Sequence, residues 1–259
     1  MGPNESELRK AAAFIGADRA VSAIDQMRPA DVWMLTVPDT WIAQVSAELA
    51  ATSVSLDAQS STRRPVAFHC SGFLPSSVLS PLASIGWHVA SVHPVLTFAS
   101  PESAVEQFQG AQCGVEGDSA ALEVLQPLFA ATGALCFPVI GERKALYHAG
   151  AVFSSNFTVV LQAIAREAWA AAGVPDEVAL KIQESLMRAT TENVMSLGPK
   201  AITGPAARGD VQVVRAQGAE VSRWHPDAGA LYSELSLLAG RLAKHRSTFP
   251  VDAPPAVGA

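Results

Sequence analysis

The chain has 259 residues, of which 49% are hydrophobic and only 16% are charged; this composition fits a folded protein of one or two domains and argues against a disordered chain. Its formal net charge is −6 and its Lys and Arg residues are scattered, which argues against a nucleic-acid partner. No apolar run reaches the roughly 18 residues of a membrane span, and the polar, acidic start is not a signal peptide, so we expect a cytoplasmic protein without a membrane partner.

Helical and strand-like patterns alternate over the first half of the chain. We expect helices over Glu5–Phe14, Trp41–Leu49, Leu74–Leu82 and Ala120–Ala131. We expect strands near Ala20–Ser22 and over Asp31–Val37, Pro65–Gly72 (with a turn at its end), His88–His93, Gln112–Val115 and Leu135–Val139, of which the one over Asp31–Val37 is buried. Strands that alternate with helices predict a mainly parallel sheet with right-handed crossovers. We therefore expect an α/β domain over residues 1–141.

From Glu142 onward the pattern is helical alone. Lys144–Ala172 is long and rich in alanine and ends at Gly173, a residue typical of helix ends. A second helix runs to Leu197, and the loop Ile202–Asp210 leads to a weaker helix. The last helix covers His225–His245. We expect an all-helical domain over residues 142–248 and a flexible tail over residues 249–259.

Five strings go beyond this generic pattern. They are, in chain order, Ala67-Phe-His-Cys-Ser-Gly72, Ser91-Val-His-Pro-Val-Leu-Thr-Phe98, Lys144-Ala-Leu-Tyr-His148, Ser154-Ser-Asn-Phe157 and Thr203-Gly-Pro-Ala-Ala-Arg-Gly-Asp210. Together they resemble a family of bacterial Rossmann-like proteins whose carboxyl-terminal domain is a domain of unknown function. That family is similar to ketopantoate reductase, pyrroline-5-carboxylate reductase and the deazaflavin-dependent NADP reductases. The resemblance implies a Rossmann-like domain, a helical domain like that of 6-phosphogluconate dehydrogenase, NADP or NAD as cofactor, and a homodimer.

The chain departs from this family in its first residues. Such proteins open with a strand, a Gly-x-Gly-x-x-Gly turn and a helix, whose N–H groups hold the pyrophosphate of the cofactor. Here the first glycines, Gly2 and Gly16, neither follow a strand nor open such a turn. We therefore expect a Rossmann-like domain that lacks its first strand and glycine-rich turn, and weak cofactor binding. A start codon placed too far downstream would explain the difference, and a truncated relative with an altered fold is the alternative.

Polar residues follow three of the expected strands. The carboxyl ends of parallel strands share one edge, where open α/β sheets bind ligands. By resemblance, we expect the turn Val37-Pro38-Asp39 to lie along the ribose of the cofactor. From their place at the next two strand ends, Ser71 and Gly72 could meet the nicotinamide or a substrate carboxylate, and His93 could donate a hydrogen bond to a carbonyl oxygen. Each also fits an ordinary turn or loop cap. The expected cofactor contacts are Val37, Pro38, Asp39, Ser71 and Gly72, and the expected substrate contact is His93.

Two other chemistries remain open at these strands. A nucleophilic Cys70 with His93 as its base is conceivable, but a buried free cysteine is usually an inert packing residue. A metal site formed by His69, His88 and His93 lacks a carboxylate or cysteine at a convincing spacing. We therefore expect no metal site, and reduced thiols at Cys70, Cys113 and Cys136.

The sharpest group of candidates lies at the start of the long helix. At 100° per residue, His148 and Ser155 lie about 40° and about 20° around the helix from Lys144, and Asn156 lies about 120° away. Lys and His can protonate or stabilise the charge that develops when a carbonyl or imine is reduced. We expect Lys144, His148 and Asn156 to be catalytic and Ser155 to bind substrate. A solvent-facing Lys144 and a packing His148 are the alternative.

The loop Thr203–Asp210 holds the remaining candidate. Gly204 and Gly209 permit tight turns, and Arg208 offers a forked donor for a carboxylate or phosphate of the substrate. The alternative is a structural Arg208–Asp210 clamp or a helix cap by Asp210.

These observations lead to one expected function and one alternative. We expect an NAD(P)-dependent oxidoreductase that reduces a small carbonyl or imine substrate in an inter-domain cleft. The alternative is a non-catalytic dimeric binding or regulatory protein derived from such a reductase. A homodimer formed through the helical domain is expected in either case, because the helix Ala149–Ala172 carries more apolar surface than one side can bury.

Overall fold

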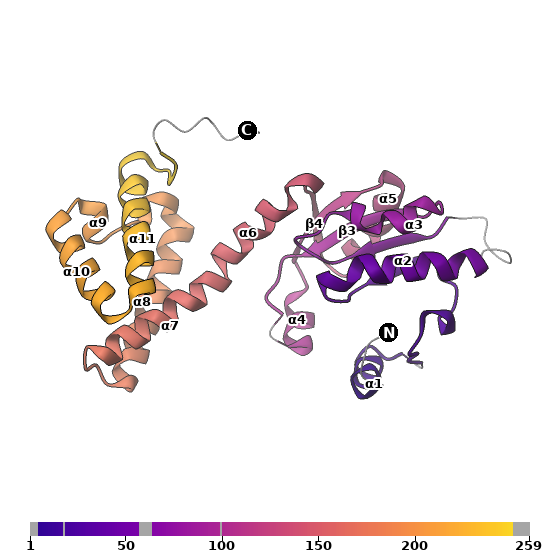
Figure 1. The fold of residues 1–259 in the computed structure, drawn as a ribbon, viewed down its shortest axis with the longest axis horizontal. Helices are drawn as coiled ribbons and strands as arrows, with labels where there is room; N and C mark the ends of the chain where they lie inside the picture. Colours follow the sequence, from indigo (N-terminus) through magenta and orange to yellow (C-terminus); the bar gives the residue numbers. More distant parts are fainter. Residues whose placement is uncertain (1–4, 18, 57–63, 99, 251–259) are drawn as a thin grey trace. The chain divides into compact units, whose positions relative to one another are not determined.

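The computed structural model describes residues 5–17, 19–56, 64–98 and 100–250. The chain divides into two compact units, Met1–Asn156 and Phe157–Ala259. The first unit contains a sheet and helices, and the described part of the second consists of helices (Figure 1). The domain boundaries expected after residues 141 and 248 stay predictions, and most of the expected tail lies outside the described residues.

The first unit is built on a five-stranded sheet in the order β1-β2-β3-β4-β5. Strands β1 to β3 are parallel, β4 runs antiparallel to β3, and β5 is parallel to β4. The mainly parallel α/β sheet is therefore confirmed, and the antiparallel step at β4 is a difference. A buried apolar strand has the same pattern in either direction, so periodicity could not predict that step. The strands are β1 (Val32–Leu35), β2 (Val66–His69), β3 (His88–Pro94), β4 (Gln112–Gly117) and β5 (Leu135–Pro138).

The first unit differs from the expected secondary structure at three further places. Ala20–Ser22 forms no strand and is followed by a short 3-10 helix. The helix expected over Leu74–Leu82 is a 3-10 turn followed by a short α-helix. The sequence analysis missed α4, although Ser100 forms a capping box with Ser103 and a proline follows it, which is a recognised helix start. The helices are α1 (Glu5–Phe14), η1 (Ile24–Gln26), α2 (Asp39–Leu56), η2 (Ser76–Leu79), α3 (Ser80–Ser84), α4 (Pro101–Gln107), α5 (Ser119–Ala131), η3 (Gly141–Arg143) and α6 (Lys144–Ser154).

Two apolar cores cover the two faces of the sheet. Ala67 and Val89 pack with residues of α2, η2 and α3 on one face, while Val66, Phe68 and other side chains pack with α5 on the opposite face. All four side chains of β2 are buried, as expected for a strand covered on both sides. Each fully buried Val or Leu contributes about 1.5–3 kcal/mol, so these cores hold the strand ends in fixed positions.

The second unit is a set of helices with a short 3-10 segment. The single long helix expected over Lys144–Ala172 is wrong: α6 ends at Ser154 and α7 begins at Asn156. Ser and Asn side chains compete for backbone hydrogen bonds and are weak helix formers, which explains an interruption here. His225 caps the last helix by accepting a hydrogen bond from the N–H of Ala228 at 3.4 Å. The helices are α7 (Asn156–Ala171), α8 (Asp176–Leu197), η4 (Gly198–Ala201), α9 (Pro205–Arg208), α10 (Val211–Trp224) and α11 (Pro226–His245).

Over the residues that the structure describes, the helices are all too short or too polar to cross a bilayer.

Candidate functional site

Asp39 and Ser71, predicted to share one edge of the sheet, are in direct contact. The Ser71 hydroxyl donates to Asp39 Oδ2 at 2.7 Å, and it accepts hydrogen bonds from the backbone N–H groups of Phe73 at 3.1 Å and Leu74 at 2.9 Å. These three bonds use the hydrogen and both lone pairs of the hydroxyl. Ser71 therefore shapes the turn after β2. Its contact with a cofactor, and that of Asp39, stay predictions.

The other expected cofactor contacts lie in the turns after β1 and β2. Val37 is half-buried and packs against the core of the first sheet face. The carbonyl of Pro38 accepts a hydrogen bond from the N–H of Trp41 at 2.8 Å, at the start of α2. Gly72 follows Ser71 and is buried. Val37 and Pro38 thus have clear structural roles, and their contact with a cofactor also stays a prediction.

Lys144 is a buried cation at the start of α6. Its residue exposure is only 2%. Its ammonium group donates to the carbonyl of Ser71 at 2.7 Å and to the hydroxyl of Ser91, and lies 3.8 Å from Oε1 of Glu116. Burial lowers the pKa of Lys144, while the nearby carboxylates of Glu116 and Asp39 oppose that shift. The alternative of a solvent-facing Lys144 is therefore wrong.

Glu116 on β4 is the carboxylate that holds this cation. Its side chain is 12% exposed, and it accepts hydrogen bonds from the N–H and the hydroxyl of Ser76, each at 2.7 Å. It thereby ties β4 to η2 and to the start of α6. Sequence reasoning missed Glu116, because a single acidic residue in a strand gives no periodic signal.

His93 and His148 meet at Gly72. Their ring centroids lie 5.7 Å apart with the planes at 82°. A Cβ atom on Gly72 would lie 2.7 Å from Nε2 of His93 and 3.0 Å from Nδ1 of His148, so the absence of a side chain at position 72 is what lets the two rings approach. Nδ1 of His148 is buried and has no hydrogen-bond partner among the described residues. The structure thus brings together three predicted site residues.

Tyr147 completes this group and was not predicted. Its hydroxyl lies 2.8 Å from Nδ1 of His93, and the two rings are edge to face with centroids 5.5 Å apart. Burial raises the pKa of Tyr147. Helical spacing offered a signal, because Tyr147 is three residues after Lys144 and therefore lies about 60° from it around the helix.

Ser155 and Asn156 are not joined to this group. Ser155 lies at the interruption between α6 and α7, where its N–H donates to the carbonyl of Ala151 at 2.9 Å. The angular spacing predicted for a continuous helix therefore does not hold beyond Ser154. Within the described ranges, no hydrogen bond links either residue to His93, Lys144 or His148. Their roles in substrate binding and catalysis stay predictions.

Arg208 is in the second unit. Its Nε donates to Oδ2 of Asp210 at 3.0 Å, and both side chains are exposed. Asp210 makes no side-chain cap to α10. The contact corresponds to the Arg208–Asp210 clamp, which was weighed as the structural alternative. Binding of a substrate by Arg208 stays a prediction.

His69 and Cys70 are the other titratable groups at the end of β2. His69 accepts a hydrogen bond at Nδ1 from the N–H of Ser71 at 3.2 Å, and its Nε2 lies 3.2 Å from the carbonyl of Pro75. Burial and the nearby Lys144 lower the pKa of His69 to about 4. Burial raises the pKa of Cys70 to about 12, which opposes thiolate formation. No group of three or more possible metal ligands is found in the described part of the chain.

A nucleotide cofactor would need a cradle for its pyrophosphate. The β1–α2 turn, Thr36-Val37-Pro38, has no glycine, and the turn after β2 has one, Gly72. Over the described ranges, no strand-to-helix turn has the spacing Gly-x-Gly-x-x-Gly that brings backbone N–H groups to a pyrophosphate. The unpartnered Nδ1 of His148 beside the bare backbone of Gly72 fits a polar group of a ligand. The residues present therefore fit one end of such a cofactor and not its pyrophosphate.

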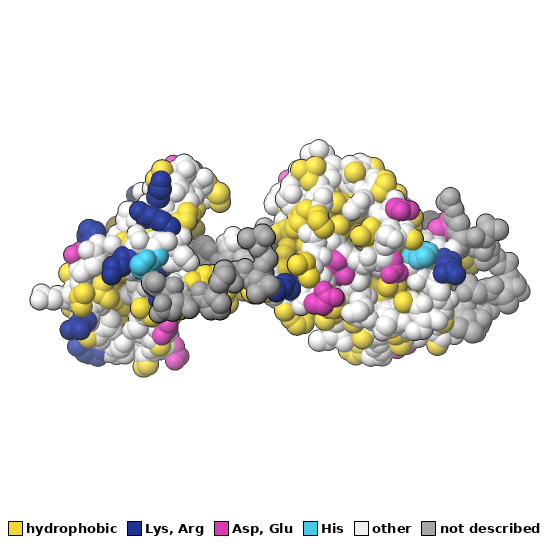
Figure 2. Space-filling model, turned by 90° about the horizontal axis from the view of Figure 1, so that it is seen from above, with side chains coloured by type: hydrophobic (Ala, Val, Ile, Leu, Met, Phe, Trp, Pro, Cys, Tyr) yellow, Lys and Arg dark blue, Asp and Glu magenta, His cyan; other side chains and the backbone are white. Residues whose placement is uncertain are grey.

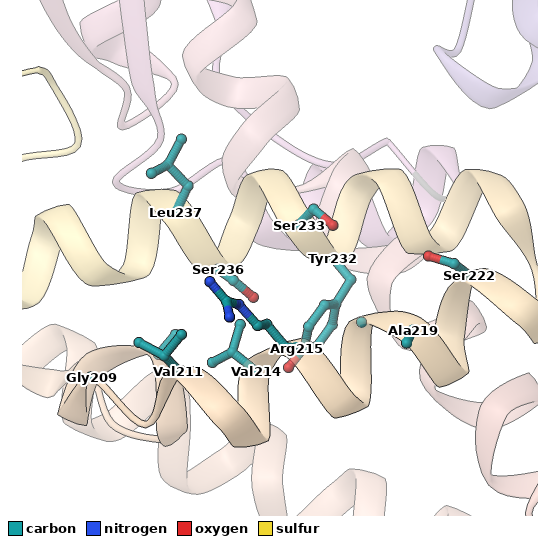
Figure 3. Close-up of a pocket in the computed structure, with 12 residues that line it drawn as sticks. Gly209, Val211, Val214, Arg215, Ala219, Ser222, Tyr232, Ser233, Ser236 and Leu237 are labelled. Atoms are coloured by element: carbon teal, nitrogen blue, oxygen red, sulfur yellow. The ribbon is translucent and has the colours of Figure 1, made fainter.

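A pocket of about 560 Å³ lies in the second unit, between α10 and α11 (Figure 3). Its lining includes Val211, Val214, Arg215, Tyr232 and Leu237. Its volume is typical of ligand pockets, but it contains none of the predicted site residues. Within the described ranges, the predicted site residues that the structure brings together lie around Gly72.

Comparison with known proteins agrees with this fold. Residues 111–239 match the family described as Domain of unknown function (DUF2520). No curated protein matches the sequence significantly.

Three solved structures are similar over most of the chain. Protein TM1727 from Thermotoga maritima is 26% identical, with a TM-score of 0.71 over 95% of this chain and 90% of that one. A proposed NADP oxidoreductase from Bacteroides fragilis, BF3122, is 21% identical, with a TM-score of 0.70 over 93% and 86%. The 1-pyrroline-5-carboxylate reductase of Streptococcus pyogenes is 14% identical, with a TM-score of 0.55 over 94% and 87%. The chain therefore has a Rossmann-like fold.

Proposed function

We propose that this protein is an oxidoreductase that uses NADP or NAD to reduce a small carbonyl or imine compound. The observation that carries the proposal is the convergence of Lys144, His93 and His148 on the Ser71–Gly72 turn. The likeness in fold to BF3122 and to pyrroline-5-carboxylate reductase supports it. When bound, the cofactor would supply the hydride, and the residues of this chain would manage charge and protons.

In this proposal Lys144 acts through its charge. The ammonium group donates to Ser71 and Ser91 and forms an ion pair with Glu116, so it is engaged within the protein. A buried positive charge nevertheless stabilises negative charge that develops close by, because the surroundings screen it weakly. The groups that would contact the substrate are His93 and His148. Asn156, Ser155 and Arg208 stay as further candidates.

We also propose that the chain holds NADPH or NADH weakly. The glycine-poor turns after β1 and β2 support this, because they offer no row of N–H groups to the pyrophosphate. The same observation favours the second candidate, a non-catalytic dimeric binding or regulatory protein derived from a reductase. A cytoplasmic location fits the three cysteines, which are all unpaired.

Binding and turnover test this function together. Titration calorimetry with NADPH and NADH should give a dissociation constant no tighter than about 100 μM, at the weak end of what enzymes show for substrates. Small keto acids and cyclic imines are then screened for NADPH consumption at saturating cofactor. His148→Gln should lower turnover about 100-fold, while the exposed His245→Gln should not.

Two results would contradict the proposal. Tight binding of NADPH would show that the chain does not need a glycine-rich turn to hold the pyrophosphate, and the proposal of weak binding would be wrong. If neither dinucleotide binds at millimolar concentration and no compound is reduced, the non-catalytic candidate takes the place of the enzyme.

A further inference from the structure

We propose that Tyr147 and His93 form a two-residue proton relay that delivers a proton to the carbonyl oxygen of the substrate. The inference rests on the proposed reductase function and adds a source for the proton that such a reduction consumes. In it, His93 contacts the substrate and Tyr147 acts through His93. Neither the family match nor the similar structures assign a role to this pair.

Two glycines make room for the relay. A Cβ on Gly114 would lie 2.6 Å from the hydroxyl oxygen of Tyr147, and a Cβ on Gly72 would lie 2.7 Å from Nε2 of His93. Neither glycine has a positive φ, so the backbone conformation does not require glycine at either position. The close approach of the Tyr147 and His93 side chains does require it. The Tyr147–His93 hydrogen bond therefore depends on glycine at positions 72 and 114.

The direction of the hydrogen bond follows from the partners of Tyr147. Its hydroxyl lies against Gly114, and Nδ1 of His93 is its hydrogen-bond partner among the described residues. The phenol hydroxyl is a stronger acid than the N–H of a neutral imidazole, so in this pair the hydroxyl is the better donor and the unprotonated ring nitrogen is the better acceptor. Tyr147 therefore donates to Nδ1. In the neutral ring the proton is then on Nε2, the atom that faces Gly72 beside His148.

The protonation states of His93 and Tyr147 are compatible with this proton transfer. Burial, followed by the nearby His148 and Lys144, lowers the pKa of His93 to about 4, and Asp39 opposes the shift. The ring is consequently neutral at pH 7 and cannot act by losing an imidazolium proton. Burial raises the pKa of Tyr147, so its proton stays in place until a stronger base develops. An alkoxide is such a base, and this difference drives the transfer.

The transfer is balanced within the relay. As the carbonyl carbon gains the hydride and its electron pair, the oxygen becomes an alkoxide and takes the proton from Nε2 of His93. At the same time Nδ1 takes the hydroxyl proton of Tyr147, so the imidazole stays neutral with its proton moved to the other nitrogen. The phenolate left on Tyr147 takes a proton from water, which reaches this half-buried side chain. The buried charge of Lys144 stabilises the anion meanwhile.

The arrangement of protons is tested without turnover. Imidazole ¹⁵N NMR of the whole chain at pH 7 should show His93 with its proton on Nε2 and Nδ1 as a hydrogen-bonded acceptor. Tyr147→Phe should give a mixture of both tautomers. Gly114→Ala should shift the spectrum in the same direction, because its methyl group displaces the hydroxyl. The control Gly150→Ala, whose added Cβ meets nothing within 4 Å, should leave the spectrum unchanged. A wild-type ring with its proton on Nδ1 would overturn the relay.

The role in the reaction is tested with the substrate found by screening. Tyr147→Phe should lower kcat about 100-fold, the effect of losing an acid catalyst, and leave KM within about twofold. A merely structural Tyr147 would change stability and KM and spare kcat. If Tyr147→Phe keeps full kcat while the wild type is active, the relay is wrong and the proposed function stands. If the wild type reduces nothing, the proposed function fails and the relay fails with it.

Discussion

Lys144 is the residue whose environment differs most from its expected one. From the sequence, the alternative to a catalytic Lys144 was a solvent-facing one, whose replacement by alanine would change stability by less than about 0.5 kcal/mol. Its position beneath the Ser71–Gly72 turn is set by three polar partners from other elements. Those partners come from distant parts of the chain, so helical spacing alone could not indicate the burial.

The burial of Lys144 leads to a prediction about stability. Lys144→Ala should lower the free energy of unfolding by about 3 kcal/mol, because the Glu116 carboxylate and the Ser71 carbonyl then lose a buried charged partner. Urea unfolding followed by circular dichroism measures this. The exposed Lys200→Ala is the matched control and should stay within about 0.5 kcal/mol. Equal stability of both variants would mean that the ammonium contributes no net stabilisation.

The site residues that the sequence predicted are those at strand ends, and the ones that it missed lie within a helix or a strand. Asp39, Ser71, Gly72 and His93 were predicted from strand ends, and three of the strands are indeed parallel, so these residues share one edge. Tyr147 and Glu116 were missed. A tyrosine in a helix and an acidic residue in a strand can have many roles. The specific roles of these two depend on the residues that folding brings next to them.

At the scale of elements, the end of β4 shows how one residue sets a strand boundary. Gly117 has a φ of 131° and pairs with Ala90 of β3. A Cβ there would lie 2.5 Å from the backbone of Val89 and Ala90, closer than any real contact. The glycine thus permits the close approach that joins the antiparallel strand to the parallel part of the sheet.

Gly117→Ala should therefore destabilise the protein by at least about 2 kcal/mol, through backbone strain and a clash that no side chain can relieve. Gly150→Ala in α6 is the opposite case, since its added methyl group meets open space; it should stabilise the chain by about 0.5–1 kcal/mol. Thermal and urea unfolding of the two variants give both values. A neutral Gly117→Ala would show that β4 tolerates a shift relative to β3.

At the scale of the whole molecule, the helical unit buries few apolar side chains among its described residues. Of its described hydrophobic residues, Ala179 and Ala228 are the buried ones. Large apolar side chains remain exposed on several helices, with Val160 at 51%, Met195 at 81% and Leu237 at 50%. Figure 2 shows hydrophobic side chains at the surface of this unit among Lys and Arg. A unit of this size needs more apolar burial than two alanines provide.

We therefore predict a homodimer formed through the helical unit, with a second copy of the chain as the cover. Light scattering should give the dimer mass at micromolar concentration. Val160→Lys should shift the protein towards monomer, because a charge would be buried without a partner. Val124→Lys on α5, at a position 40% exposed in the first unit, is the control and should keep the dimer. A wild-type monomer across the micromolar range would contradict the prediction.

The sequence by itself determined the class of the fold, an α/β region followed by helices, and it placed five of the six expected strands within a few residues of their observed bounds. It could do so because hydrophobic period and the residues at turns are local properties. The tertiary structure alone decided the direction of β4, the burial of Lys144 and the meeting of His93, Tyr147 and His148. Each of these depends on contacts between residues far apart in the chain, and a pattern read along one segment contains no information about its distant neighbours.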